Sequence, residues 1–305
     1  MASRALAVAT PFDHELPALE IRSSRWQGWL TRGISAALLV TVLLRLQHFG
    51  FSAAVAALPR SFGFWAAFAA YYLSLPLSEW VIFRRLWQLP AKGIAALLRK
   101  LVSNEILLGY SGEAYFYAWA RQHAKLVATP FGAIKDVSIL SALAGNLITI
   151  LMLAVSWPFV NDLAPALHGQ TIAASSAFVL GVSFIILAFR NRLFSLESSA
   201  LRFVFSIHIA RLLVTTILAA IMWHIAMPDV SLLWLVILAT LQLLVSRLPF
   251  IPSKDLVFAS LAVFVIGNSG TVSIVITMIA TAIVMTHLVL GAVLMLPEFV
   301  RKEDI

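Results

Sequence analysis

The chain has 305 residues, of which 61% are hydrophobic and 12% charged, and its formal net charge is +8. A mean hydropathy of +0.94 is too apolar for a soluble globular domain, so the composition excludes that class and indicates an integral membrane protein. The absence of cysteine excludes disulfide frameworks, iron–sulfur ligation and thiol chemistry.

Long apolar runs dominate the chain after a polar segment at 1–32. That segment lacks the apolar core of a cleavable signal peptide, so we expect the first hydrophobic run to direct insertion. Runs of about 20 apolar residues suit helices that cross a bilayer, and the alternating pattern of a membrane barrel is missing. We therefore predict an all-α, polytopic transmembrane helical bundle, with one transmembrane domain at 33–296 and a tail at 297–305. Its eight predicted spans lie near 33–50, 62–83, 137–157, 171–189, 203–226, 231–246, 255–267 and 271–295.

The distribution of Lys and Arg predicts the orientation of these spans. With an even number of spans, both termini share one side of the membrane with the longer basic connections. Of the 22 Lys and Arg, all but Arg45, Arg60 and Arg211 fall on that side or at its edge. By the positive-inside rule this side is cytoplasmic. The pI near 10.2 then reflects topology and contact with anionic lipid, and nucleic acid is not an expected partner.

A short helix is predicted in the basic interval between the second and third spans. Residues 94–108 sort on a helical wheel into a leucine face and an opposite face that carries Arg99 and Lys100. At 1.5 Å per residue the helix is about 22 Å long, which is too short to cross a bilayer. The Gly-Tyr-Ser-Gly sequence at 109–112 permits a tight turn, after which Ser111 can cap a second helix.

We expect this helical hairpin, near 94–125, to take one of two arrangements. It either lies at the interface as an amphipathic anchor or re-enters the bilayer and lines a polar cavity. Glu105 keeps the second arrangement open, because it projects among the leucines and not on the polar face. Glu113 falls in the first turn of the second helix, where the helix dipole favours an acid, and it can share a polar face with Arg121.

Ionisable residues inside predicted spans are further candidates, because a central charge costs about 2.5–3.5 kcal/mol and needs compensation. Arg211 shares a helical face with His208 and Thr215. It either meets a phosphate or carboxylate headgroup in a cavity, or it pairs with Glu79 or Glu105 and joins two helices.

Glu79 has a second possible partner. It follows Pro76, which frees a backbone carbonyl and can kink the helix. It lies about one turn from Arg84 and Arg85, and an interfacial ion pair with them is the favoured interpretation.

The third span carries a stripe of small and polar residues. Its members recur on one helix face and are Ser138, Ser141, Gly145 and Thr149. Such stripes usually allow close helix packing, so we assign no ligand to this one.

The region from Ser246 to Gly267 contains a broken helical element. Two prolines three residues apart end the preceding helix, and the apolar run that follows is about 20 Å long. Lys254 and Asp255 stand at its entrance. Helix termini at a cavity can hold charged substrate groups, and an ordinary cytoplasmic turn explains the same residues.

No cofactor is predicted. His208 and His224 lie about 160° apart on one helix, so they cannot share a haem face, and no lysine lies well inside a span to hold a retinal. Acyltransferase, sugar-nucleotide and nucleophile-elbow motifs are missing. We therefore expect no metal site and no enzyme activity. The enzymatic alternative is a lipid-headgroup transferase with Glu105 and Glu113 as acid and base.

The order of these features resembles a known family. A charged hairpin with Gly112-Glu113 after the second span, and a late paired-helix element that opens with Leu248-Pro249, are similar to the membrane domain of lysylphosphatidylglycerol synthase, a flippase-like family. The resemblance covers roughly residues 62–296. Family members carry a Gly-rich run ending in Arg-Glu where this chain has Ile-Pro-Ser-Lys254-Asp255, so the charge pairing is kept and the glycines are lost.

The resemblance implies movement of a lipid or polyprenyl-linked headgroup between the leaflets of a bacterial inner membrane. The residues expected around a cytoplasm-facing polar cavity are Glu105, Glu113, Arg121, Arg211 and Lys254. Cations would hold phosphate, acids would hold an amine or a proton, and membrane lipids would be the partners. No Walker motif is present, so ATP is not expected as the direct energy source. The alternative is a non-catalytic membrane subunit that docks on a partner protein or on a second copy of the chain.

Overall fold

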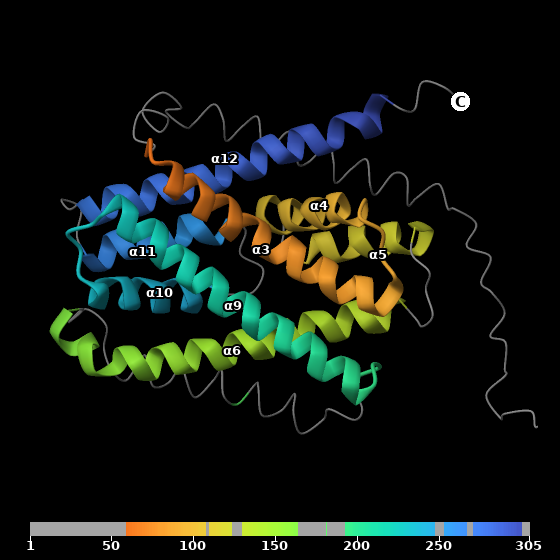
Figure 1. The fold of residues 1–305 in the computed structure, drawn as a ribbon, viewed down its shortest axis with the longest axis horizontal. Helices are drawn as coiled ribbons and strands as arrows, with labels where there is room; N and C mark the ends of the chain where they lie inside the picture. The colour runs from red at the N-terminus through yellow and green to blue at the C-terminus, as the bar shows by residue number, and fades with distance from the viewer. Residues whose placement is uncertain are drawn as a thin grey trace, which may run out of the picture.

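The computed structural model describes residues 59–107, 110–123, 130–163, 193–247, 253–266 and 271–300, together with Gly181. All regular structure in these ranges is α-helical (Figure 1). The helices are α3 (Phe62–Trp87), α4 (Gly93–Ile106), α5 (Ser111–His123), α6 (Pro130–Leu163), α9 (Ser198–Ala226), α10 (Leu232–Ser246), α11 (Lys254–Ile266) and α12 (Thr271–Val300).

Four of these helices are long and apolar enough to cross a membrane, and they confirm four of the predicted spans. The membrane-length segments are Phe62–Trp87, Phe131–Pro158, Ser198–Ala226 and Val275–Leu294. The predicted spans near 33–50 and 171–189, the segment 1–32 and most of the tail fall outside the described residues, apart from Gly181. The count of eight spans is therefore supported only in part.

Two predicted spans are too short to cross a bilayer as straight helices. α10 has 15 residues and α11 has 13. At 1.5 Å per residue they are about 22 Å and 20 Å long, against a hydrocarbon core of about 30 Å. The two helices pack against each other and form a second short hairpin.

The predicted pair of helices near 94–125 is present as α4 and α5, which pack on each other. α4 also packs on α3 and α12, so this hairpin belongs to the bundle. Figure 1 shows α4 and α5 in one half of the long axis, and α10 and α11 in the other. The two hairpins meet where the Ser253 amide donates a hydrogen bond to the Glu105 carbonyl at 2.8 Å.

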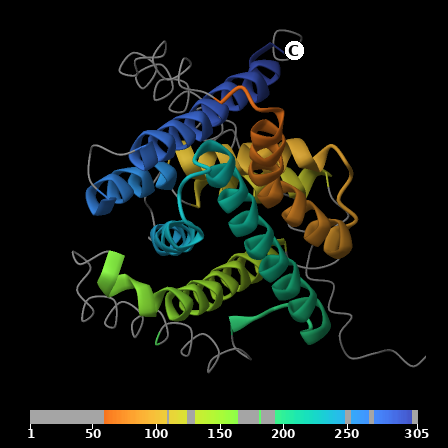
Figure 2. The same ribbon diagram turned by 60° about the vertical axis from the view of Figure 1, so that its left-hand side comes forward.

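α9 lies between α3 on one side and α6 on the other (Figure 2). The apolar core beside it includes Phe64 from α3, Trp223 from α9 and Phe258 from α11, which are all buried. The start of α9 is fixed by Asp136 of α6, which is fully buried. Its carboxylate accepts hydrogen bonds from the amides of Ser195 and Leu196, at 2.6 Å and 2.8 Å.

The turn between α4 and α5 differs from the prediction in its capping. Tyr110 takes the left-handed conformation, with a φ of 75°. The Ser111 hydroxyl donates back to the Ser103 carbonyl at 2.9 Å, so it does not cap α5. The Asn104 side chain performs that role, because its oxygen accepts a hydrogen bond from the Gly112 amide at 2.8 Å.

Gly112 allows the two helices to approach closely. A Cβ atom at this position would collide with the backbone carbonyl of Lys100, which cannot move as a side chain could. We expect Gly112→Ala to lower the unfolding free energy by about 1–3 kcal/mol through overpacking. The measurement is the thermal unfolding midpoint in detergent, followed by tryptophan fluorescence.

Gly63→Ala in α3 is the matched control, because its nearest atoms would lie 3.7 Å from the added Cβ. Equal midpoints for the two variants would contradict the close approach of α4 and α5.

Candidate functional site

A buried ion network attaches the α4–α5 hairpin to α3. Lys100 of α4 is 4% exposed, and its Nζ lies 2.5 Å from Glu79 Oε1 and 3.4 Å from Glu113 Oε1. Burial lowers the pKa of Lys100, but the two carboxylates raise it by more, so this pKa lies above its usual value. One ammonium thus joins α3, α4 and α5.

This network corrects two predictions and adds a partner to a third. The wheel placed Lys100 on a polar outer face, but the structure buries it. Glu79 was expected to pair with Arg84 and Arg85 at an interface, but it is 7% exposed and binds Lys100. Glu113 lies in the first turn of α5 as predicted, yet its charged partner is also Lys100.

Two arginines approach the middle of α6 from different helices. Arg211 of α9 donates to the Ser141 hydroxyl at 3.3 Å, and its Nε is buried without a hydrogen-bond partner. Arg247 follows α10. Within the described ranges its guanidinium donates to the hydroxyl of its neighbour Ser246, at 2.8 Å and 3.0 Å. Its guanidinium occupies the space above Gly145, where any Cβ would collide with it. Ser141 and Gly145 are one turn apart, about 6 Å along α6, so the two guanidiniums lie close together.

Neither guanidinium forms an ion pair with an acid in the described ranges. The ion pairs within 4.0 Å there involve Lys100 and Lys135. The Glu79 carboxylate, which binds Lys100, still acts on Arg211 through its charge. Burial lowers the pKa of Arg247 to about 10, and the positive charge of Arg211 adds to this shift. The two arginines therefore form a positive centre with no directly bound acid.

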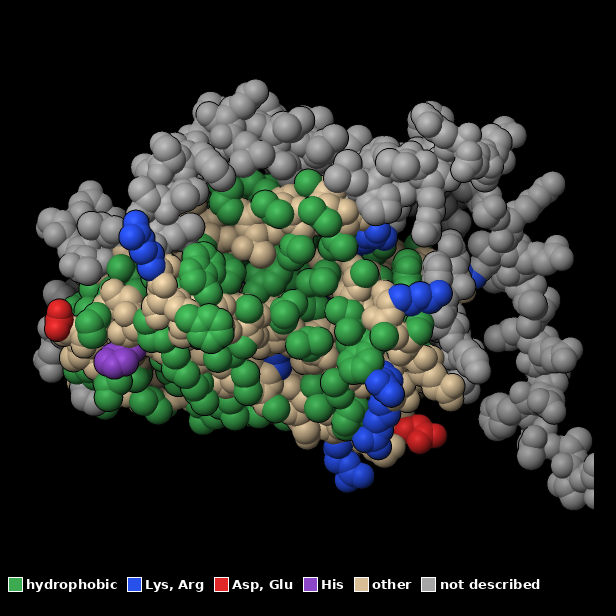
Figure 3. Space-filling model, turned by 45° about the horizontal axis from the view of Figure 1, so that its top comes forward, with side chains coloured by type: hydrophobic (Ala, Val, Ile, Leu, Met, Phe, Trp, Pro, Cys, Tyr) green, Lys and Arg blue, Asp and Glu red, His purple; other side chains and the backbone are tan. Residues whose placement is uncertain are grey.

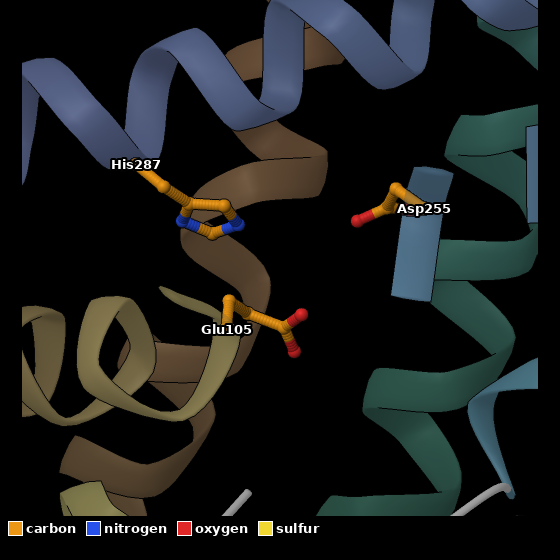
Figure 4. Close-up of side chains that lie close together, drawn as sticks. All are labelled: Glu105, Asp255 and His287. Carbon is orange, nitrogen blue, oxygen red and sulfur yellow. The ribbon is translucent and has the colours of Figure 1, made fainter. Parts of the chain in front are cut away.

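A third polar group lies where the hairpins meet. Figure 4 shows Glu105 of α4, Asp255 of α11 and His287 of α12 facing a common space. Burial raises the pKa of Glu105 to about 7, the Asp255 carboxylate adds to the rise, and Lys254 opposes it. The Lys254 ammonium itself donates to the Ser246 carbonyl at 3.1 Å, so it bridges the ends of α10 and α11.

The cavity beside Asp255 is small. It is lined by Tyr71, Gln242, Asp255 and apolar side chains, and it is of a size to hold about one water molecule. The Gln242 amide donates to the Tyr71 hydroxyl at 3.0 Å. In this conformation the space admits a water or a small ion but no lipid headgroup.

The predicted site residues that remain are His208 and Arg121. His208 is fully buried on α9, one turn before Arg211, and its ring nitrogens make no hydrogen bond within the described ranges. Arg121 lies away from the site, with its guanidinium 5.5 Å from the ring centre of Tyr117. The predicted pairing of Arg211 with Glu79 or Glu105 is not among the ion pairs of the described residues, and Glu79 binds Lys100 instead.

The sequence analysis missed Lys100, Arg247 and His287 as site residues. Lys100 and Arg247 had been counted as topology charges, and His287 had no partner in the sequence. The stripe of small residues on α6 could have indicated a site for Arg247, because Arg211 donates to Ser141 and the Arg247 guanidinium packs over Gly145.

Comparison of the chain with family models, curated proteins and solved structures gave no match. The resemblance to the lysylphosphatidylglycerol synthase membrane domain therefore stays a prediction.

The Lys100 network predicts a large and specific stability effect. We expect Lys100→Met to lower the unfolding free energy by about 3 kcal/mol or more, because two carboxylates then remain buried without their cation. Chemical unfolding in detergent, with tryptophan fluorescence as the signal, measures this. Adding Glu79→Gln to that variant should restore part of the loss by removing one unpaired acid.

Lys92→Met, at an exposed position just before α4, is the control for loss of a lysine. Equal stability of the Lys100 and Lys92 variants would show that the network does not hold the hairpin.

Proposed function

We propose that this chain is a membrane protein that binds the phosphate of a lipid headgroup and moves it between the two leaflets. The observation that carries the proposal is the pair Arg211 and Arg247, two half-buried arginines that form no ion pair with an acid among the described residues. The biological setting we propose is a bacterial inner membrane, with both termini cytoplasmic.

An uncompensated pair of cations inside a membrane protein favours an anionic ligand. Each buried charge costs several kcal/mol when it is unpaired, and the mutual repulsion of two arginines increases that cost. A bound phosphate lowers both the cost of burying the charges and the repulsion between the two arginines, because guanidinium groups bind phosphate oxygens in a bidentate manner. The hydroxyls of Ser141 and Ser246, which now bond the guanidiniums, can donate to the same oxygens.

The two hairpins supply a route through the bundle. Helices that only half cross a bilayer place non-helical backbone at depth, and such backbone is tolerated where it lines a polar cavity. α4–α5 and α10–α11 meet at the contact between Glu105 and Ser253, near the guanidiniums. The small cavity beside Asp255 corresponds to a closed state, and we propose that the α10–α11 hairpin separates from α6 to admit the headgroup.

The outer surface suits contact with acyl chains. Hydrophobic side chains cover much of the face drawn in Figure 3, and most of its Lys and Arg lie toward the edges. Large apolar side chains on α6 and α9 are exposed, among them Leu151, Val155, Leu213 and Ile217. A headgroup can therefore enter the polar interior while its acyl chains stay in lipid.

The geometry favours transport over the transferase alternative. Glu113 belongs to the Lys100 network, and Glu105 belongs to the group with Asp255 and His287. An acid and a base that act on one substrate would have to line the same cavity, whereas these two carboxylates belong to different groups of side chains.

The arginine pair predicts loss of phosphate-lipid binding. We expect Arg211→Gln and Arg247→Gln each to reduce the number of phospholipids that remain bound after delipidation, measured by native mass spectrometry. Each variant should also slow the flipping of a fluorescent phosphatidylglycerol in proteoliposomes by at least about tenfold, since a lost charge-assisted hydrogen bond is worth about 1.5–3 kcal/mol.

Arg202→Gln is the matched control, because Arg202 lies on the same helix and is exposed. Lipid retention and flipping at the level of this control in both site variants would contradict the proposal.

The proposed opening can be tested by a reversible lock, because the chain has no cysteine of its own. The hydroxyls of Ser156 on α6 and Thr240 on α10 lie 2.6 Å apart and are both buried. We expect the double variant Ser156→Cys with Thr240→Cys to form a disulfide without large rearrangement. Oxidation should stop headgroup movement, and reduction should restore it.

The two single cysteine variants control for the substitutions themselves. Full flipping activity in the oxidised double variant would show that α10 does not leave α6 during transport.

A further inference from the structure

The group formed by Glu105, Asp255 and His287 has the geometry of a metal site. One ligand atom from each side chain lies within 4.8 Å of the other two. The three residues come from α4, α11 and α12, and Figure 4 shows their side chains directed toward the same space. Two carboxylates and one imidazole are therefore gathered from three separate helices.

Two further observations indicate that this space receives a ligand. Glu105 Oε2 is inaccessible to solvent and has no hydrogen-bond partner, which is costly for a carboxylate oxygen. His287 is 4% exposed, and its Nδ1 lies 2.7 Å from the Tyr72 hydroxyl. That contact fixes the orientation of the ring and leaves Nε2 for a ligand, as outer partners of metal-binding histidines do.

We propose that Glu105, Asp255 and His287 bind a divalent transition-metal ion such as Zn²⁺ or Mn²⁺. The mixed oxygen and nitrogen donors favour these ions over Mg²⁺ and Ca²⁺, which prefer oxygen ligands alone. Tetrahedral ligands about 2.1 Å from a metal lie about 3.4 Å from one another, so the ligand atoms, now within 4.8 Å, need to approach one another by up to about 1.4 Å.

The surroundings provide the rest of the coordination. The three side chains would leave one tetrahedral position for a water molecule. The small cavity beside Asp255 is a separate space, because neither Glu105 nor His287 lines it. When both carboxyl groups are ionised, they face one nearby ammonium, that of Lys254, which leaves a net negative charge for the ion. The Lys254 ammonium is engaged by the Ser246 carbonyl and does not occupy the metal position.

A bound ion would join the two hairpins to α12. Glu105 ends the α4 side of one hairpin, and Asp255 begins the α11 side of the other. The metal would hold them together in addition to the two hydrogen bonds that the amide and the hydroxyl of Ser253 donate to the Glu105 carbonyl. This inference does not depend on headgroup movement, because it concerns only the three ligands and their helices.

Metal binding to the full chain tests the site. The protein is purified in detergent without an affinity tag and treated with EDTA, and it is then titrated with Zn²⁺, Mn²⁺ and Mg²⁺ by calorimetry. We expect one Zn²⁺ per chain, Mn²⁺ at the same site, and no binding of Mg²⁺. Glu105→Gln, Asp255→Asn and His287→Gln should each weaken Zn²⁺ binding about tenfold or more.

His224→Gln, which alters an exposed histidine, is the control and should bind Zn²⁺ as the unchanged chain does. A second measurement uses Co²⁺, whose visible absorption reports an imidazole ligand and should change in His287→Gln but not in the control. Circular dichroism establishes that each variant keeps its helices. The proposal would be overturned if the unchanged chain bound no Zn²⁺, or if all three site variants bound Zn²⁺ as tightly as the unchanged chain does.

Discussion

The cost of burying charge in an apolar bundle is the constraint on which this structure depends. Lys100 shows how the cost is met, because one ammonium lies between Glu79 and Glu113 and so connects α3, α4 and α5. α4 has 14 residues and is too short to cross the bilayer, so burial of its apolar surface alone does not account for its position in the bundle. The ion network and the close helix contact at Gly112 hold the α4–α5 hairpin in place.

The cost of burying charge also explains why charged groups without an oppositely charged partner in the described ranges would favour a ligand. Within the described ranges, the guanidiniums of Arg211 and Arg247 bond hydroxyl groups, whereas Glu105 and Asp255 are two acids beside a histidine. One centre therefore attracts an anion and the other attracts a cation. Both lie close to the junction of two hairpins that are too short to cross the bilayer. We interpret this junction as the functional site and the four longer helices as the scaffold that positions it.

The long helices could be predicted from the sequence because apolar length is a local property of the chain. The α4–α5 pair was also predicted, since its short length and glycine turn are local signals. The burial of Lys100 was not, because the wheel assumed that lysine faces water, and its two acids come from other helices. α10 and α11 were placed as spans by their hydropathy. The sequence already indicated that the second run is short, at about 20 Å, but it did not indicate that α10, with 15 residues, also falls short of the bilayer thickness. Arg211 was identified because an arginine inside a span is rare, whereas Arg247 was hidden among the topology charges.

The central claim is that Arg211 and Arg247 together hold a lipid phosphate. A cryo-electron microscopy map of the chain in nanodiscs that contain phosphatidylglycerol tests it most directly. We expect headgroup density between the two guanidiniums, above Ser141 and Gly145 of α6. A map in which both arginines are paired with carboxylates of the chain, with no lipid density between them, would show that they do not hold a phosphate.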